Sequence, residues 1–243
     1  MKAIVLAAGT GSRLGNLTKD CTKGMVSVRG KKLIDYLLDF LDLSWLEEVV
    51  VVGGFGYQEL EEHLLGKKLS NLKILENKDF LKGNIYTLIT GLKEIKEESF
   101  LITNVDHIYP SKMFVKMKEG FKGITGMCDF DRSLGADDMK VELREDQKKI
   151  RNISKKLTNF QAGYIGMTYV DSSCLNLYKD ALDKALQKYG DKAVVENILQ
   201  ILSEDSKTSP NIFDLSGFGW YEVDNSTDLA KAESGLLKDP NFS

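Results

Sequence analysis

The sequence predicts an α/β protein in which helices flank a mixed, mostly parallel central sheet. Apolar strand-like runs alternate with helical patterns as far as residue 120, which is typical of consecutive βαβ units. The strands of this half are continuously apolar, as strands are when helices cover both faces of a parallel sheet. Because such sheets bind ligands at the carboxyl ends of their strands, the loops that follow these strands are the first candidates for a site.

Hydrophobic periodicity places the elements in order along the chain. In the first half, strands are expected at 2–7, 47–54, 72–77 and 99–106, and helices at 32–43, 57–66, 84–95 and 111–120. The second half is different, because the strand-like runs 122–130, 139–146, 148–154 and 162–170 follow with few helices between them. We expect these to be antiparallel or mixed strands that extend the sheet and form a small lobe. Helices at 172–189 and 193–202 follow, then strands at 211–216 and 220–225 and a closing helix at 226–237, N-capped by Ser226 or Asn225.

Composition limits the classes of function. The 243 residues are 42% hydrophobic, contain few prolines and show no low-complexity linker or repeat, so we expect a single domain. A formal net charge of −3 gives no sign of the excess of basic residues that is typical of nucleic-acid-binding proteins. No apolar stretch approaches the roughly 18 residues of a membrane span. We therefore expect a cytoplasmic protein that acts on small molecules without nucleic acid or membrane partners; a homo-oligomer stays open.

The cysteines and histidines offer little on their own. Cys21, Cys128 and Cys174 are widely spaced and unpaired in sequence, which argues against a disulfide framework and a zinc site. His63 lies on an expected helix face and has no predicted role. His107 follows Asp106 directly, so alternation along a continuing strand would turn its side chain away from that carboxylate.

The loop behind the first strand indicates an anion site. Residues 7–15, "AAGTGSRLG", are nearly all small or flexible, so backbone N–H groups can approach a ligand closely. Arg13 and Lys23 add positive charge to the same loop. Arginine offers bidentate contacts and lysine a mobile point charge, so we predict that both bind phosphates.

Two known phosphate-loop fingerprints fit this loop poorly. No lysine follows a second glycine as a Walker loop requires. The dinucleotide pattern fits only through Gly9 and Gly11, although Asp35 is at a suitable distance to meet a ribose. A dinucleotide-dependent oxidoreductase would also need a helix to begin directly behind the glycines, whereas residues 16–25 read as a long polar loop.

The 33 residues "LAAGTGSRLGNLTKDCTKGMVSVRGKKLIDYLL" resemble the signature of nucleotidyltransferases that activate phosphorylated sugars and alcohols. "NVDHIYP" resembles the strand-end aspartate motif of that family, and "GWYEVDNSTDLAKAE" resembles its late aspartate segment. The resemblance implies a Rossmann-like GT-A fold, with a nucleotide-binding half at 1–128 and an acceptor-side half at 129–243. It also implies Mg²⁺ as cofactor, bound by Asp106 and Asp224.

The same resemblance assigns the remaining site residues. It implies that Arg13 and Lys23 are catalytic. The segment "KGNIYTL" resembles part of the nucleotide pocket, and residues 138–167 resemble the segment that closes on the acceptor phosphate. The nucleotide-binding residues are then expected to be Leu6, Ala7, Ala8, Gly9, Thr10, Gly11, Ser12, Gly83 and Asn84. The acceptor-binding residues are expected to be Lys140, Lys155 and Gly163.

The family resemblance is strongest to cytidylyltransferases. We expect transfer of CMP from CTP to inositol phosphate or a phosphocholine-type acceptor, with release of pyrophosphate. The alternatives are a sugar-1-phosphate guanylyl-, uridylyl- or thymidylyltransferase and a non-catalytic nucleotide sensor, although a sensor is expected to have lost loop cations or metal carboxylates. One departure is Thr22, which stands where the family usually has a proline that stiffens the loop.

Overall fold

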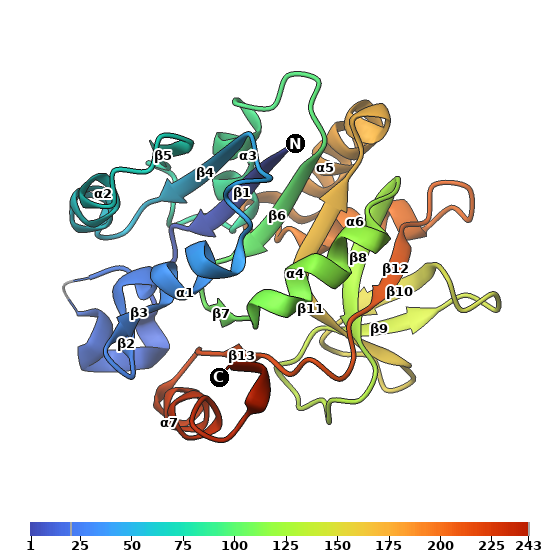
Figure 1. The fold of residues 1–243 in the computed structure, drawn as a ribbon. Helices are drawn as coiled ribbons and strands as arrows, with labels where there is room; N and C mark the ends of the chain where they lie inside the picture. The colour runs from blue at the N-terminus through green and yellow to red at the C-terminus, as the bar shows by residue number, and fades with distance from the viewer. Residues whose placement is uncertain (20, 243) are drawn as a thin grey trace.

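The computed structural model describes residues 1–19 and 21–242, and Figure 1 shows a central twisted sheet with helices on both faces. Among these residues a nine-stranded sheet has its main path in the order β10-β9-β11-β6-β1-β4-β5, with β8 paired to β11 and β12. The strands are β1 Lys2–Ala7, β4 Glu48–Gly53, β5 Leu72–Glu76, β6 Phe100–Asn104, β8 Ile124–Asp129, β9 Lys140–Leu143, β10 Ile150–Ser154, β11 Ala162–Val170 and β12 Asn211–Asp214. The helices are α1 Leu33–Phe40, α2 Tyr57–Gly66, α3 Ile85–Leu92, α4 Ser111–Met117, α5 Leu175–Tyr189, α6 Glu196–Ser203 and α7 Ser226–Gly235.

The direction of the strands changes between the two halves of the chain, as the sequence predicts. β1 pairs in parallel with β4 and β6, and β4 pairs in parallel with β5. β11 runs antiparallel to β6, β8 and β9, so it joins the second half to the first within one sheet. The expected boundary between halves at residue 128 falls inside β8.

Alternate side chains of the buried strands supply two separate cores, one on each face of the sheet. On β1, Ile4 belongs to the core that also includes residues of α3, α5 and α6, whereas Val5 belongs to the core that includes residues of α1, α2 and α4. This alternation is the period of two that a strand imposes. It explains why β1, β4 and β6 are apolar at nearly every position.

A third, smaller apolar cluster lies outside the sheet and positions the ends of several loops. The short strands β7 (His107–Ile108) and β13 (Tyr221–Glu222) pair antiparallel beside α7, at the bottom of Figure 1. Ile108 and Val223 from this ribbon pack with Leu14 and Ala232. The cluster therefore connects the opening loop, the segment after β6 and the C-terminal helix.

Two local details refine the sequence predictions. The polar stretch behind β1 contains short 3₁₀ turns at Ser12–Thr18 and Lys23–Met25, which hydrophobic periodicity does not reveal. The closing helix α7 is N-capped by Asn225, whose side chain accepts hydrogen bonds from the backbone N–H groups of Thr227 and Asp228 at 2.9 and 3.1 Å.

The packing of α3 on β1 gives a test of the fold. A Cβ at Gly91 would lie 2.5 Å from Ile4 Cγ2, so Gly91→Ala forces the helix away from the strand. We expect this overpacking to lower the free energy of unfolding by about 1–3 kcal/mol in urea titrations. The matched control is Gly66→Ala at the end of α2, where nothing lies within 4 Å of the new methyl group. An equal loss in both variants would contradict this packing.

Candidate functional site

Two carboxylates from distant parts of the chain converge on one ammonium group. Lys23 Nζ lies 2.7 Å from Asp106 Oδ2 and also forms a short ion pair with Asp224 Oδ1. Asp106 lies in the turn that follows β6, and Asp224 lies between β13 and α7. The backbone N–H of Val223 donates to the Asp106 carbonyl at 2.9 Å, so the β7–β13 ribbon fixes the spacing of the two acids.

The charges in this cluster depend on one another. Burial lowers the pKa of Lys23, but the carboxylates of Asp106 and Asp224 outweigh burial, and the pKa is raised overall. Burial likewise opposes ionisation of Asp106, but Lys23 and His107 hold the pKa of this carboxyl well below its usual range. The cluster is therefore an ionised carboxylate–ammonium network at neutral pH.

Arg13 extends the network to the protein surface. Its guanidinium donates to Asp224 Oδ2 at 2.6 Å, and its other terminal nitrogen lies 4.0 Å from Asp137. The side chain is 54% exposed, unlike that of Lys23 at 10%. Arg13 and Lys23 therefore lie together, one at the mouth of the site and one inside it.

Asp106 and Asp224 fit a divalent cation by donor type and by placement. Both carboxylates already share one cationic group, and Mg²⁺ takes one or two carboxylates together with substrate phosphates. Sequence reasoning missed a further cluster, in which ligand atoms of Asp106, His107 and Glu222 lie within 4.8 Å of one another. The sequence signal for Glu222 is its position two residues before Asp224.

The prediction that His107 turns away from Asp106 depended on a continuing strand. β6 ends at Asn104, and the turn brings His107 Nδ1 to 2.6 Å from Asp106 Oδ1. The imidazole ring is stacked between Tyr109 and Trp220, with ring centroids 5.6 and 5.4 Å away. Burial lowers the pKa of His107, but Asp106 and Glu222 raise it overall. His107 therefore positions the Asp106 carboxylate and carries charge beside it.

The opening loop, residues 7–15, has a backbone that a ligand can approach closely. Leu6, Ala7 and Ala8 are buried at the end of β1, Gly9 and Ser12 are exposed, and Thr10 and Gly11 are partly buried. Gly11 has φ +63° and anchors the turn, because its carbonyl accepts from Leu14 N at 2.8 Å and Thr18 Oγ1 at 2.7 Å. This conformation favours glycine.

Thr22 has the backbone conformation of the proline that the family usually has at this position. Its φ is −66°, which is the value a proline ring would fix, and it is fully buried. Its hydroxyl donates to the Ala7 carbonyl at 3.1 Å. The loop before Lys23 is thus held by a side-chain hydrogen bond to the end of β1.

Gly83 and Asn84 precede α3 as expected, but their contacts are with the protein. Gly83 N donates to the Asp191 carbonyl at 2.6 Å, and a Cβ at Gly83 would lie 1.9 Å from the Ala193 carbonyl oxygen. Asn84 Oδ1 accepts from Val195 N at 3.0 Å. Both residues thus join α3 to the segment before α6, and their expected contact with a nucleotide stays a prediction.

Two of the three expected acceptor residues also have structural roles. The Lys140 ammonium is buried and donates to the carbonyls of Gly135, Asp138 and Lys155 at 2.6, 3.4 and 2.9 Å. The space beside Gly163 is filled by the Leu134 side chain. Both residues therefore support the 132–139 loop. Lys155, in contrast, is exposed and lines a hollow beside His107 and Glu222.

Two neighbouring hollows open beside the charged cluster. The larger, of about 360 Å³, is lined by Arg13, Asp224 and the 132–138 loop. The smaller, of about 50 Å³, shares Glu222 with the larger and is lined by Glu196, Trp220 and Lys155 among others. Gly166, which sequence reasoning also missed, has φ +78° there, and a Cβ would lie 2.9 Å from His107 Nε2. The larger hollow gives an anionic reactant room beside the cations.

Asp35 does not support the dinucleotide interpretation. It lies in α1, where its carboxylate contacts His63 Nε2 at 2.8 Å and Lys67 Nζ at 2.9 Å from α2. A short turn and a polar segment separate the glycines from α1. His63, for which the sequence predicts no role, thus helps to join two helices.

The comparison with known families agrees with this arrangement. Residues 3–123, about half of the chain, match the model of the MobA-like NTP transferase domain. The chain belongs to the nucleotidyltransferases. The matched residues contain the opening loop, Lys23 and Asp106, whereas Asp224 lies outside them.

Curated relatives of this nucleotidyltransferase include proteins of two architectures. The bifunctional IPC transferase and DIPP synthase of Aquifex aeolicus is 27% identical over 239 residues, which cover 97% of this chain and 52% of the relative. The chain thus spans about half the length of that relative. The choline-phosphate cytidylyltransferase of Streptococcus pneumoniae is 26% identical over 253 residues, covering 99% of this chain and all of the relative.

Solved structures agree on the fold. The inositol-1-phosphate CTP transferase from T. maritima superposes with a TM-score of 0.79 at 22% identity, covering 98% of this chain and 96% of that chain. A UDP-glucose pyrophosphorylase complexed with UDP-glucose gives 0.77 at 15% identity, with 98% of both chains covered. The nucleotidyltransferase therefore has the GT-A-like fold that its sequence predicts.

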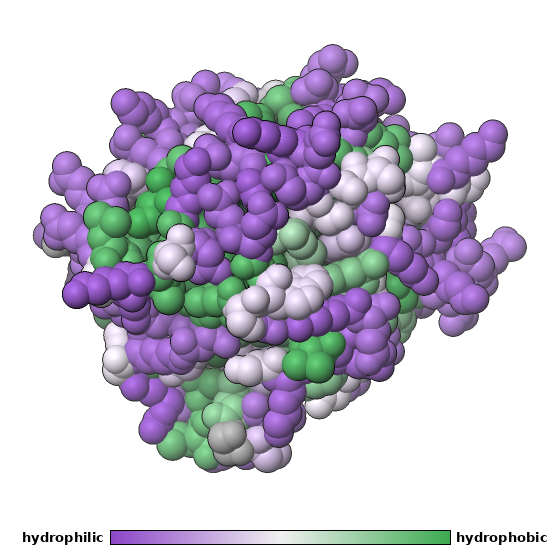
Figure 2. All heavy atoms as spheres, turned by 45° about the horizontal axis from the view of Figure 1, so that its top comes forward, coloured by the Kyte–Doolittle hydropathy of each residue, from purple (hydrophilic) through white to green (hydrophobic). Residues whose placement is uncertain are grey.

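The surface in Figure 2 is mostly hydrophilic, with apolar areas between the polar side chains. Within residues 1–19 and 21–242, no helix has the length and apolarity needed to cross a membrane.

The His107–Asp106 contact predicts a pH-dependent contribution to stability. Because the pKa of His107 is raised on folding, its stabilisation is complete below the unfolded pKa of about 6.5 and is lost as pH rises through the folded pKa. We expect the loss of unfolding free energy in His107→Gln to be largest near pH 6 and to shrink towards pH 9. Urea titrations of both proteins across this range measure the difference. A loss that grows with pH would refute the charged contact.

Proposed function

We propose that this nucleotidyltransferase transfers CMP from CTP to a phosphorylated small molecule and releases pyrophosphate. The observation that carries the proposal is the convergence of Arg13, Lys23, Asp106 and Asp224 beside two hollows at the carboxyl end of β1. Two of the relatives named above support cytidylyl transfer. One is a bifunctional IPC transferase and the other is a choline-phosphate cytidylyltransferase.

The proposed reaction joins two anions, so catalysis depends on charge and position. An oxygen of the acceptor phosphate attacks the α-phosphorus of CTP, and the bond to pyrophosphate breaks. A phosphate is already ionised, so little general-base catalysis is needed. Arg13 and Lys23 bind the α-phosphate and the leaving group, where negative charge grows, and the amides of residues 9–12 bind the other phosphates. Mg²⁺ held by Asp106 and Asp224 supplies further positive charge.

The acceptor is proposed to carry positive charge opposite its phosphate. Glu196 and Glu222 line the smaller hollow, and neither has a salt bridge among the described residues. Burial raises the pKa of both carboxyls. The Trp220 ring is already in contact with the protein, because it stacks with His107 and the Arg132 guanidinium lies 3.8 Å from its centroid. Recognition by carboxylates therefore favours a phosphocholine-type acceptor over inositol phosphate.

The direct test is pyrophosphate release with Mg²⁺, crossing CTP, UTP, GTP, ATP and dTTP with a panel of acceptors. The panel holds phosphocholine, inositol 1-phosphate and several sugar 1-phosphates. We expect release with CTP and phosphocholine. Release only with a sugar 1-phosphate and another nucleotide would support the alternative sugar nucleotidyltransferase.

Variants of the charged cluster give the matched controls for that test. Asp106→Asn should lower kcat by at least about 100-fold, because it removes a carboxylate that holds Lys23, and would hold Mg²⁺, beside the reacting phosphates. Lys184→Met removes an exposed cation of α5, outside the hollows, and should leave kcat unchanged. No turnover of any pair by folded wild-type protein that still binds CTP would favour a nucleotide sensor.

The role of Glu196 predicts a change in acceptor preference. We expect Glu196→Gln to raise KM for phosphocholine about ten-fold and to leave KM for inositol 1-phosphate, which has no cationic group, within two-fold, because only the ammonium-bearing acceptor needs the carboxylate. Steady-state pyrophosphate release with each acceptor measures both values. Equal increases for the two acceptors would exclude charge recognition by this residue.

A further inference from the structure

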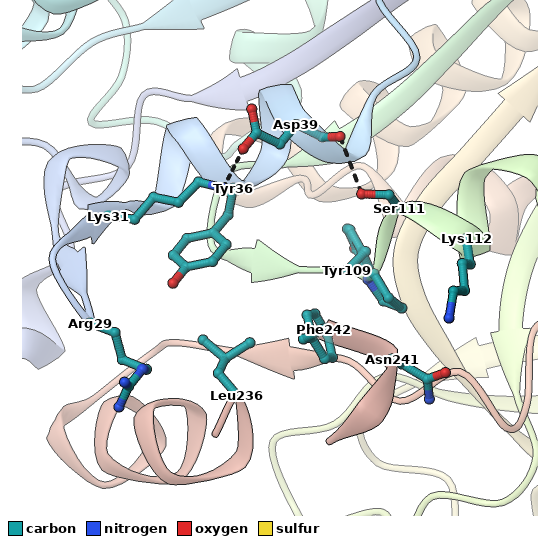
Figure 3. Close-up of a pocket in the computed structure, with 11 residues that line it drawn as sticks. Arg29, Lys31, Tyr36, Asp39, Tyr109, Ser111, Lys112, Leu236, Asn241 and Phe242 are labelled. Atoms are coloured by element: carbon teal, nitrogen blue, oxygen red, sulfur yellow. Dashed lines mark hydrogen bonds and ion pairs between the residues drawn. The ribbon is translucent and has the colours of Figure 1, made fainter. Parts of the chain in front are cut away.

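A further cavity, separate from the two hollows beside the charged cluster, has the features of a ligand site. It holds about 370 Å³, which is within the usual range for small-molecule pockets. Figure 3 shows its walls, which come from the β2–β3 hairpin (β2 Ser27–Val28, β3 Lys31–Lys32) with α1, from the β7–α4 junction, and from the segment after α7. None of its lining residues belongs to the charged cluster.

The cavity is rich in cations with little acid to balance them. Arg29, Lys31 and Lys112 line it, and Asp39 is its single carboxylate within the described residues. Asp39 forms an ion pair with Lys31. The guanidinium of Arg29 and the ammonium of Lys112 form no ion pair among the described residues, although the backbone N–H of Arg29 donates to Glu233 Oε1 at 3.4 Å. The cavity therefore has an excess of positive charge that an anionic ligand can neutralise.

Two aromatic rings lie between the cations. Figure 3 shows Arg29 and Lys31 on one side of the cavity, Lys112 on the other, and the rings of Tyr36 and Phe242 between them. The Tyr36 ring is fixed by a hydrogen bond from its hydroxyl to the Val28 carbonyl at 3.1 Å. Phe242 packs against Tyr221, with ring centroids 5.5 Å apart. Flat apolar surfaces beside unpaired cations suit a ligand that combines a planar ring with a phosphate.

Each wall of the cavity continues into the charged cluster. Arg29 lies six residues after Lys23, and Tyr109 lies three residues after Asp106 and stacks on His107. Leu236 follows α7, the helix that begins just after Asp224. A ligand that contacts all three walls would therefore bias the relative positions of Lys23, Asp106 and Asp224.

We propose that this cavity is a second ligand site, for a nucleoside monophosphate or a closely similar ring-bearing phosphate, and that its occupant acts as an effector of the charged cluster. The phosphate is bound by Arg29 at one side of the cavity, the ring lies against Tyr36 and Phe242, and Lys112 adds a second cation at the other side. This goes beyond the proposed function, in which nucleotide binds only at the opening loop.

Equilibrium dialysis with labelled CMP tests the site without relying on turnover. We expect two equivalents bound to the wild type and one to the double variant Arg29→Ser with Lys112→Ser. Lys23→Met should keep the cavity equivalent. The matched control, Lys148→Ser with Lys184→Ser, removes two exposed cations elsewhere and should bind as the wild type does. One equivalent that the cavity variant loses and Lys23→Met keeps would support this site even if the proposed reaction failed.

Two further measurements decide between ligand types. Phe242→Ala keeps the cations and should weaken CMP binding at the cavity about ten-fold, and inorganic phosphate should compete at least ten-fold less well than CMP. Addition of CMP to the wild type should change kcat, and the double variant should not show this change. CMP stoichiometry in the double variant equal to that of the wild type would overturn the site. Equal competition by inorganic phosphate would overturn the nucleotide assignment.

Discussion

The site depends on the ammonium of Lys23, which is shared by Asp106 and Asp224. Two partly buried carboxylates that share one ammonium repel each other, and the cation between them offsets this repulsion. The Lys23 ammonium therefore sets the spacing of the β6 end against the β13–α7 junction. Arg13, His107 and Glu222 are arranged around this centre, each in contact with one of the two acids or close to it.

The regular elements of the fold were predictable because their signals are local. β1, β4 and α2 lie where periodicity places them, since strands buried on both faces and amphipathic helices have distinct patterns. The antiparallel second half also followed from strand runs without intervening helices. The two-residue pairing of β7 with β13 was beyond prediction, because so short a ribbon has no periodicity and joins segments distant in sequence.

Prediction of the site was less complete, for a physical reason. A motif gives residue types at a spacing, but it does not say which donors are already used by the protein. The ammonium of Lys140 is occupied by three carbonyls, and Gly163 leaves room for Leu134 rather than for a ligand. Glu222 and Gly166 were missed because their importance comes from tertiary contact with His107, which no local pattern contains.

The same ion pairs that hold the site together also restrain it. Arg13 and Lys23, the proposed phosphate ligands, are paired with Asp224, so an incoming phosphate must compete with a carboxylate for both cations. That competition costs several kilocalories per mole for a buried charge unless another cation takes over the carboxylates. A proposed Mg²⁺ on Asp106 and Asp224 meets this need and leaves both side chains free for phosphate. Without such a cation, phosphate binding to Arg13 and Lys23 would leave two partly buried carboxylates without a partner.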